Sequence, residues 1–544
     1  MFLSLPLAVL VSLLATLPVA CQEPADLVVT GGRVVTVDSE EPEVRALAAR
    51  GESIVAVGSE AEISTLIGPD TTVIDLDGRL VVPGFIDGHG HFISLGNSLL
   101  SLDLRPARTW SGVVAIVKGA VAKAAPGELI SGRGWHQEKW DHPPQSVFEG
   151  LPYHHSLSAI SPDNPVILSH ASGHATFANA RAMAMSGIDA DTADPRGGEV
   201  VRDAEGEAIG VFRETASRLL APARRNSKSS DLRRVAELAA KECLSKGVTS
   251  FQDAGSPLST VEVFRTLADE GALGVRLWVM LNDSNRRLEA ALPTLDVRGI
   301  GSRHLTVGGI KRVIDGALGS HGAWLLEPYS DKPDSTGLNT TPIATIQETA
   351  RLAIAHRLQL CVHAIGDRAN REILDIYEAA LGSVPDGNER RWRVEHAQHL
   401  HPDEVPRFAE LGVIASMQGI HCTSDGSWVP TRLGAERSAS GAYLWRELID
   451  SGVVVSNGTD CPVEDVDPIL CFHATVTRLL ADGTLFFPER RMTRLEALRS
   501  YTINAAYAVF EEELKGSLTV GKLCDLVIIS KDILACPAEE ILEA

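Results

Sequence analysis

The chain has 544 residues, enough for three or four domains of roughly 150 residues each or for one large barrel with an appended domain. Acidic residues outnumber basic ones by 71 to 50, and the formal charge of −21 argues against binding to nucleic acid or to anionic membrane surfaces. Hydrophobic residues make up 44% of the sequence, which excludes a disordered chain, and 8 cysteines without a Cys-x-x-Cys pair argue against a cysteine-based zinc motif.

The N-terminal segment is apolar. Residues 1–20 contain no charged side chain, and polar sequence follows from Gln22 onward. The segment is short for a membrane span, so it predicts a signal peptide and export to the periplasm or the cell envelope. Its end, Leu17 to Cys21, resembles a bacterial lipobox, in which the cysteine carries a lipid. We therefore expect membrane attachment only through a lipid on Cys21, with simple secretion as the alternative.

Short β-rich runs occur near both ends of the chain. The stretch 26–37 places two such runs around Gly31 and Gly32, a pattern that predicts a β-hairpin. Further strands are expected at 53–58 and 72–78, and matching pieces lie at 516–518 and 525–529. Each end alone is too small to bury a core of its own. We therefore expect residues 22–80 and 505–544 to pair as the two parts of a small β-sandwich.

Residues 81–504 show a different pattern, in which short apolar strands alternate with helical stretches such as 345–356 and 403–411. This alternation is typical of parallel strands that are joined by crossover helices. The length of the segment suits an α/β fold with a (β/α)₈ TIM-type barrel that carries insertions.

Five apolar runs in this region each end in a residue that can bind a metal ion. These residues are His89, Lys311, His363, His396 and Asp460, and His91 follows His89 by two positions. In a barrel, the C-terminal ends of the strands form the face where active sites lie. His396 follows His363 by about one β/α unit, and Asp460 follows His396 by about two. Each motif alone is weak evidence, but the ordered set predicts one metal site.

The residue types suit hydrolytic chemistry. Imidazole and carboxylate groups are ligands for Zn²⁺ and similar divalent ions, and such an ion lowers the pKa of a bound water to about 7. Asp460 could both bind the metal and take the proton of the attacking water. Lys311 is unusual, because an ammonium group is repelled by a dication. Carbamylated by CO₂, Lys311 would be an anionic ligand able to bridge two metals; otherwise it binds substrate or forms a salt bridge.

Several longer motifs resemble the amidohydrolase superfamily, and within it the YtcJ-like branch that includes N-substituted formamide deformylases. The resemblance extends from about Asp26 to Ile529. Its motifs are PGFIDGHGHF at 83–92, GHATFANARAM at 173–183, GVTSFQDAG at 247–255, IKRVIDGALGS at 310–320, VHAIGDRAN at 362–370, RVEHAQ at 393–398, NGTDCPV at 457–463 and GSLTVGKLCDLVII at 516–529. The set is specific in combination.

The resemblance implies a barrel that carries one or two metal ions, usually zinc. The ligands it implies are His89, His91, Lys311, His363, His396 and Asp460. It also implies hydrolysis of a non-peptide C–N bond, such as an amide or a formamide, in a small-molecule substrate. Two alternatives stay open. The same site could act on esters, lactones or cyclic ureas, or the chain could be a non-catalytic lipoprotein that binds a metal or a solute.

Three further residues are candidates for substrate binding. His174 lies in a motif that the family places near the substrate, although it could also form a structural pair with His170. Trp324 and Tyr329 lie in the long segment after Lys311. A loop of this length in a compact domain is often a lid, and the alternative is that both aromatic residues pack the loop onto the barrel.

Overall fold

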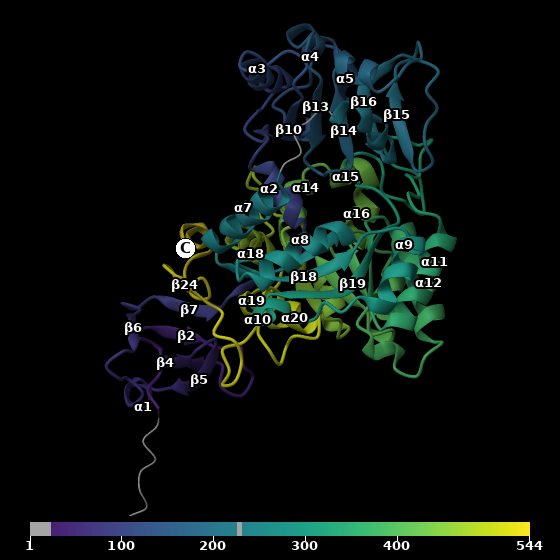
Figure 1. Cartoon of the computed structure of the whole chain (residues 1–544). Coiled ribbons are helices and arrows are strands. Elements are labelled where there is room, and N and C mark those ends of the chain that lie inside the picture. Colours follow the sequence, from purple (N-terminus) through teal and green to yellow (C-terminus); the bar gives the residue numbers. More distant parts are fainter. Residues whose placement is uncertain (1–22, 226–230) are drawn as a thin grey trace, which may run out of the picture.

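The computed structural model describes residues 23–225 and 231–544. The predicted signal peptide and Cys21 lie outside these residues. A barrel occupies the centre of the molecule, a separate sheet lies on one side of it, and two small sheets lie on another side (Figure 1). Within the two described ranges, no helix is both long enough and apolar enough to cross a membrane.

Eight parallel strands form the barrel, and their order around it follows the sequence. They are β8 (Phe85–Gly90), β17 (Val248–Ser256), β18 (Arg276–Leu281), β19 (Leu305–Val313), β20 (Gln359–Ala364), β21 (Arg393–His396), β22 (Ile414–Met417) and β23 (Val455–Asn457). The barrel is nearly closed, because the first and last strands are adjacent without forming a regular pair. This confirms the predicted α/β fold and is consistent with a TIM-type barrel.

Two glycines let β8 and β23 approach each other. A Cβ at Gly88 would lie 2.5 Å from the carbonyl oxygen of Asn457, and a Cβ at Gly458 would lie 2.4 Å from the backbone nitrogen of His89. The backbone nitrogen of Asp460 donates to the carbonyl oxygen of His89 at 2.6 Å. The seam between the two strands is therefore formed by backbone atoms in direct contact, immediately beside two predicted metal ligands.

Amphipathic helices pack against the barrel. They include α7 (Leu232–Ser245), α8 (Leu258–Asp269), α11 (Ile343–His356), α12 (Asp367–Leu381) and α13 (Val405–Glu410). In α7 the buried residues are Val235, Ala236, Ala239, Ala240 and Cys243, which form one stripe at helical spacing. The helix predicted at 345–356 is present as α11, and the one at 403–411 is a 3₁₀ turn (Pro402–Glu404) followed by α13.

Shorter helices fill the remaining connections. They are α2 (Phe92–Ser98), α9 (Asn285–Ala291), α10 (Ile300–Arg303), α14 (Gly419–Asp425), α15 (Val429–Leu433), α16 (Ala435–Gly441), α17 (Trp445–Asp450), α18 (Pro468–Thr477), α19 (Arg494–Ser500) and α20 (Ile503–Tyr507).

Two four-stranded sheets contain most of the N-terminal strands. One is formed by β1 (Leu27–Thr30), β4 (Ala46–Arg50), β5 (Ser53–Gly58) and β6 (Thr72–Asp75), and the other by β2 (Arg33–Val35), β3 (Glu43–Val44), β7 (Leu80–Pro83) and β24 (Leu526–Ile529). β24 pairs antiparallel with β7, so a C-terminal strand joins one of the two sheets of N-terminal strands.

The hairpin predicted around Gly31 and Gly32 is wrong. β1 pairs with β4 and β6, whereas β2 pairs with β3 and β7, so the two strands belong to different sheets. Val29 of β1 and Val34 of β2 still enter one hydrophobic cluster. Burial of both strands against a shared core therefore outweighs the local turn preference of the glycine pair.

A six-stranded sheet is inserted between β8 and β17. Its strands lie in the order β15 (Gly198–Arg202), β16 (Ala208–Glu214), β14 (Ala175–Ala178), β13 (Val166–His170), β10 (Ile130–Trp135) and β9 (Leu102–Asp103). Helices α3 (Trp110–Val121), α4 (His155–Ile160) and α5 (Ala180–Met185) belong to the same part of the chain. This part has hydrophobic clusters of its own, separate from the barrel core. The sequence predicts insertions in the barrel but did not reveal this sheet.

Candidate metal centre

The predicted ligands gather at the C-terminal ends of the barrel strands. His89 lies on β8, Lys311 on β19, His363 on β20 and His396 at the end of β21. His91 and Asp460 lie just beyond β8 and β23. Because all eight strands are parallel, these ends share one face of the barrel.

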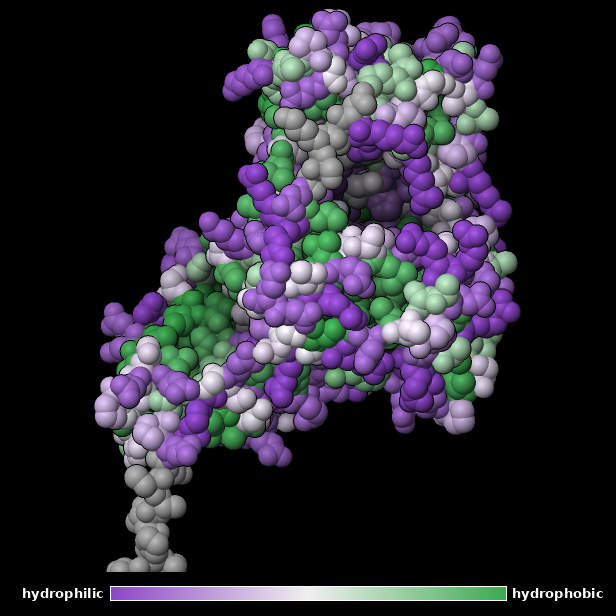
Figure 2. Space-filling view, in the orientation of Figure 1, coloured by the Kyte–Doolittle hydropathy of each residue, from purple (hydrophilic) through white to green (hydrophobic). Residues whose placement is uncertain are grey.

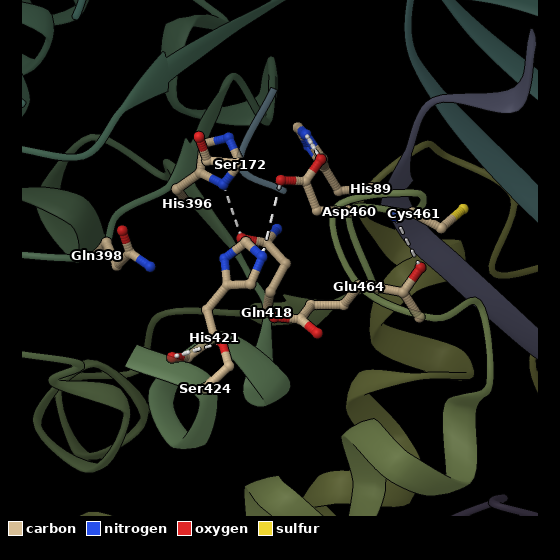
Figure 3. Close-up of polar contacts among 12 residues, drawn as sticks. His89, Ser172, His396, Gln398, Gln418, His421, Ser424, Asp460, Cys461 and Glu464 are labelled. Carbon is tan, nitrogen blue, oxygen red and sulfur yellow. Dashed lines mark hydrogen bonds and ion pairs between the residues drawn. The ribbon is translucent and has the colours of Figure 1, made fainter. Parts of the chain in front are cut away.

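Three of these residues form the centre of the cluster. One ligand atom each from His89, His396 and Asp460 lies within 4.8 Å of the other two, and all three residues are buried. In Figure 3 their side chains point toward one another. Nε2 of His89 lies 3.6 Å from Oδ1 of Asp460. The three groups lie on or just beyond the first, sixth and eighth strands, so the barrel brings together residues that are remote in the sequence.

The other three predicted ligands surround this centre. Nε2 of His91 lies 3.1 Å from Oδ1 of Asp460. Nζ of Lys311 lies 3.5 Å from Nε2 of His89. The ring of His363 stands edge-on to that of His396, with centroids 4.4 Å apart. All six predicted residues are therefore in one contiguous cluster.

Hydrogen bonds fix the orientation of two imidazoles. Nδ1 of His89 contacts a carboxylate oxygen of Glu395, and Nδ1 of His396 donates to Oε1 of Gln418 at 2.7 Å. In both rings the other nitrogen, Nε2, is left for the centre of the cluster. Such outer partners hold metal-binding histidines in the tautomer and ring orientation that the metal needs.

The charges of the site suit a cation. Burial and the Lys311 ammonium lower the pKa of His89 to about 4, so this imidazole is neutral at neutral pH. Burial raises the pKa of Asp460, but the imidazoles of His91, His89 and His396 lower it more, and the net pKa is well below its usual range. The site therefore offers the neutral imidazole of His89 and an ionised carboxylate, the protonation states of metal ligands.

Two of the predicted ligands have unusual backbone conformations. His396 has φ of 76° and Asp460 has φ of 55°, a region that non-glycine residues rarely adopt. Such positions cost about 1–3 kcal/mol each and persist only when the surrounding structure imposes them. Here the tightly packed ends of β21 and β23 impose the turn that directs both side chains into the centre.

The residues fit a divalent metal ion. Oδ1 of Asp460 and Nε2 of His363 are buried and make no well-aligned hydrogen bond among the described residues, although Nε2 of His91 lies 3.1 Å from the first and Oδ1 of Asp315 lies 3.4 Å from the second. A cation would satisfy these atoms, which are otherwise costly to bury. Imidazole nitrogens with a carboxylate oxygen are the donors that zinc and similar ions prefer.

A pocket opens onto the centre, and its lining includes His174, His363, His396, Gln398, His421, Trp428 and Asp460. Figure 2 shows a hollow between the inserted sheet and the barrel. His174, on the inserted part, hydrogen-bonds through Nδ1 to Glu214 at 2.8 Å, and its ring lies 4.9 Å from that of His363. The inserted sheet thus contributes a side chain to the pocket of the barrel.

Trp324 and Tyr329 lie in the segment between β19 and α11 and are not among the residues that line this pocket. Tyr329 is buried and donates through its hydroxyl to the carbonyl oxygen of Ala323. The indole of Trp324 packs under the guanidinium of Arg368. The substrate-binding role of these two residues stays a prediction.

Some residues of the site were not predicted from the sequence. Nε2 of His421 lies 3.8 Å from Oδ2 of Asp460, as the dashed line in Figure 3 marks. Glu395 contacts His89, and Glu214 contacts His174. Glu395 directly precedes His396 in the RVEHAQ motif, and this position is the sequence feature that points to a role near the metal centre. His421 follows β22 without any motif that marks it.

The comparisons with known proteins agree with this geometry. The amidohydrolase family model matches residues 72–544. The chain is 34% identical over 519 residues to Protein LONG AFTER FAR-RED 3 of Arabidopsis thaliana, covering 93% of this chain and 87% of that protein. It is 28% identical to YtcJ of Bacillus subtilis, which is named as an amidohydrolase. That match covers 93% of this chain and 94% of the relative. It is also 28% identical to the N-substituted formamide deformylase of Arthrobacter pascens, with 95% and 96% covered.

Solved structures show the same fold. An uncharacterized metal-dependent hydrolase from Pyrococcus furiosus is similar with a TM-score of 0.70 at 28% identity, covering 93% of this chain and 99% of that one. A second, from Pyrococcus horikoshii, has a TM-score of 0.74 at 24% identity, with 94% and 99% covered. On these matches the chain belongs to the amidohydrolase family and is a hydrolase that acts on carbon–nitrogen bonds.

Proposed function

We propose that this chain is an exported, metal-dependent hydrolase that cleaves a non-peptide C–N bond, such as that of an amide or a formamide. The observation that carries the proposal is the approach of His89, His396 and Asp460 to within 4.8 Å, beside a pocket that His396 and Asp460 line. The relative named N-substituted formamide deformylase and the structures named metal-dependent hydrolases support it.

His89, His91, His363, His396 and Asp460 would hold the metal, which is zinc or a similar divalent ion. When bound, such an ion supplies an acidified water and a Lewis acid for the carbonyl oxygen. Asp460 accepts a proton from the attacking water and passes it to the leaving nitrogen. His174 and the pocket walls orient the carbonyl group and limit the access of bulk water, and we retain Trp324 and Tyr329 as candidates for substrate contact.

Lys311 would become a further ligand through carbamylation. Burial lowers the pKa of this lysine, and the neutral amine is the form that adds to CO₂, losing one proton as the carbamate forms. The product is an anionic oxygen ligand that can bridge two ions. A second metal ion and carbamylated Lys311 are therefore proposed together.

A metal analysis and a substrate screen test the proposed function. The purified full-length protein is assayed for bound metal and for hydrolysis of matched amides, formamides and esters, with and without bicarbonate. Hydrolysis of amides or formamides that chelation abolishes is the expected result. Hydrolysis of esters, lactones or cyclic ureas alone would reassign the substrate, and bound metal without any hydrolysis would indicate a binding protein.

Export and lipidation complete the proposal. They rest on the apolar segment 1–20 and on Cys21. The mass of the mature N-terminus from cells grown with and without globomycin tests them. A shift that depends on globomycin is expected for the lipid, and its absence leaves simple secretion.

We also propose that the two small sheets form the β-sandwich predicted from both chain ends. Two observations support this architecture. Val29, Val34, Leu47 and Val81, from both sheets, belong to one hydrophobic cluster, and β24 joins the C-terminal part to β7.

A further inference from the structure

An ion pair is sealed inside the barrel next to the metal centre. Arg393 and Glu395, both on β21, have side chains that are 0% exposed. Nε of Arg393 donates to Oε1 of Glu395 at 2.7 Å, and Nη2 donates to Oε2 at 3.0 Å. Residues two apart on a strand point to the same face, so the alternation of β21 directs both side chains into the barrel interior.

The guanidinium of Arg393 is held from three other strands. Nη2 donates to the carbonyl oxygen of Gly88 on β8 at 2.7 Å and to Oγ of Ser416 on β22 at 2.8 Å. Nη1 donates to Oε1 of Gln252 on β17. These contacts use all three nitrogens and leave the guanidinium little freedom to move. Arg393 is therefore a rigid support for the carboxylate of Glu395.

Glu395 in turn reaches a metal ligand. Its Oε2 contacts Nδ1 of His89, which is also 0% exposed. A carboxylate can only accept here, so Nδ1 of His89 carries the proton and the lone pair lies on Nε2. That nitrogen faces Oδ1 of Asp460 at 3.6 Å. The chain of contacts from Arg393 through Glu395 thus ends at Nδ1 of His89 and leaves Nε2 of the same ring free to bind the metal.

A purely structural role does not account for this arrangement. Buried ion pairs contribute little net stability, because the cost of removing both charges from water offsets their attraction. Glu395 also differs from an ordinary ion-pair partner, since one of its oxygens is shared between the guanidinium and an imidazole ligand.

We propose that Glu395 is a positioning residue which, supported by Arg393, fixes the tautomer and ring orientation of His89 and thereby sets the affinity of the site for its divalent metal. The inference rests on the metal dependence in the proposed function. It predicts that metal affinity depends on the reach of the Glu395 carboxylate as well as on its charge.

Two substitutions separate these properties. Glu395→Asp keeps the charge that pairs with Arg393 but withdraws the carboxylate from His89, whereas Glu395→Gln keeps the length and removes the charge. Glu404→Asp and Glu404→Gln serve as controls, because Glu404 is also buried and is held by Arg371 at 2.6 Å and by Arg407 at 2.7 Å, outside the metal cluster. The controls disturb the ion pairs of a buried glutamate with two partly exposed arginines, without touching a predicted ligand.

The full-length proteins are stripped with a chelator and titrated with Zn²⁺ against a fluorescent competitor, and circular dichroism verifies that each is folded. Both Glu395 variants should bind Zn²⁺ about 10–100-fold more weakly than wild type, while the Glu404 variants bind it normally. If Glu395→Gln fails to fold because Arg393 is left unpaired, Glu395→Asp decides the question.

Wild-type affinity in a folded Glu395 variant overturns the proposal, as does an equal loss in the Glu404 controls. If wild type itself binds no Zn²⁺ or other divalent ion, the proposed metal dependence fails and the role of Glu395 fails with it. The two failures are distinguishable, because only the second appears in the unsubstituted protein.

Discussion

The surroundings of Asp460 suit the two tasks proposed for it, metal binding and proton transfer. Its Oδ1 faces the imidazoles of His89 and His91, and its Oδ2 faces His421. One oxygen is thus placed among the metal ligands while the other points toward the pocket wall. The net lowering of its pKa keeps the carboxylate ionised at neutral pH, which both metal binding and proton transfer require.

Replacing Asp460 with Asn keeps the shape of the side chain and removes its charge and its proton affinity. We expect Asp460→Asn to lower kcat on the order of 10²–10⁴-fold, the usual contribution of a general base, with little change in the circular dichroism spectrum. Steady-state kinetics on the substrate found in the screen measure the effect. Near-normal turnover in the folded variant would remove Asp460 from the mechanism.

His174 tests the contribution of the inserted sheet to substrate binding. It lines the pocket and is held by Glu214, but it is not part of the tight metal cluster. His174→Ala should raise KM about tenfold, the effect of losing one good hydrogen bond, and leave the metal content unchanged. Kinetics and metal analysis on the same preparation check both points. A loss of metal instead would place His174 among the ligands.

At the scale of elements, the seam between β8 and β23 joins the two ends of the barrel sheet. Gly88 and Gly458 permit this approach, since a Cβ at either position would collide with backbone atoms of the other strand as well as with a side-chain oxygen of Ser456 or Asp87. His89 and Asp460 stand on opposite sides of the seam. Its width therefore sets the distance between two residues of the metal centre.

Gly458→Ala should widen this seam. The added methyl group would meet the backbone of His89, and we expect a loss of about 1–3 kcal/mol in the free energy of unfolding together with weaker metal binding. Gly119→Ala in α3 is the matched control, because its Cβ has no neighbour within 4 Å and alanine favours helix. Chemical denaturation and Zn²⁺ titration provide the readouts. Equal behaviour of the two variants would contradict the account.

At the scale of the whole molecule, the inserted sheet is tied to the barrel by charged groups. Arg432 of α15 donates to Glu138 of the inserted part at 2.6 Å and also contacts Asp331 in the segment after β19. Nε of Arg133 donates to the carbonyl oxygen of Pro462, just beyond β23, at 3.1 Å. The pocket is therefore bounded by parts of the chain that meet only in the folded protein.

Metal removal tests the coupling of the site to the whole fold. The ligands come from strands on opposite sides of the barrel, so a bound ion stabilises the folded state and not the unfolded chain. At a free-ion concentration of about 100 Kd the gain is about 2.7 kcal/mol. Thermal unfolding should occur at a lower Tm after chelation and recover with Zn²⁺. An unchanged Tm, with metal loss shown by elemental analysis, would contradict this coupling.

Local sequence patterns predict much of the fold and of the candidate site. The barrel was predictable because apolar runs alternate with amphipathic helices, and the six candidate ligands were predictable because each lies at or just beyond the end of such a run, where parallel strands share one face. The hairpin at Gly31 and Gly32 failed as a prediction, because a turn motif does not reveal which core each neighbouring strand will join. The inserted sheet left no signal that distinguished it from the barrel strands.

The tertiary structure alone decided how the ligands are oriented. Glu395 and His89 are 306 positions apart, and His421 carries no motif that links it to Asp460. The hydrogen-bond partner of one imidazole nitrogen determines which nitrogen faces the centre. Packing of the barrel brings that partner in from a distant strand. The sequence by itself determined which residues take part, whereas the closed barrel determined the distances and tautomers, because both are set by contacts between segments remote along the chain.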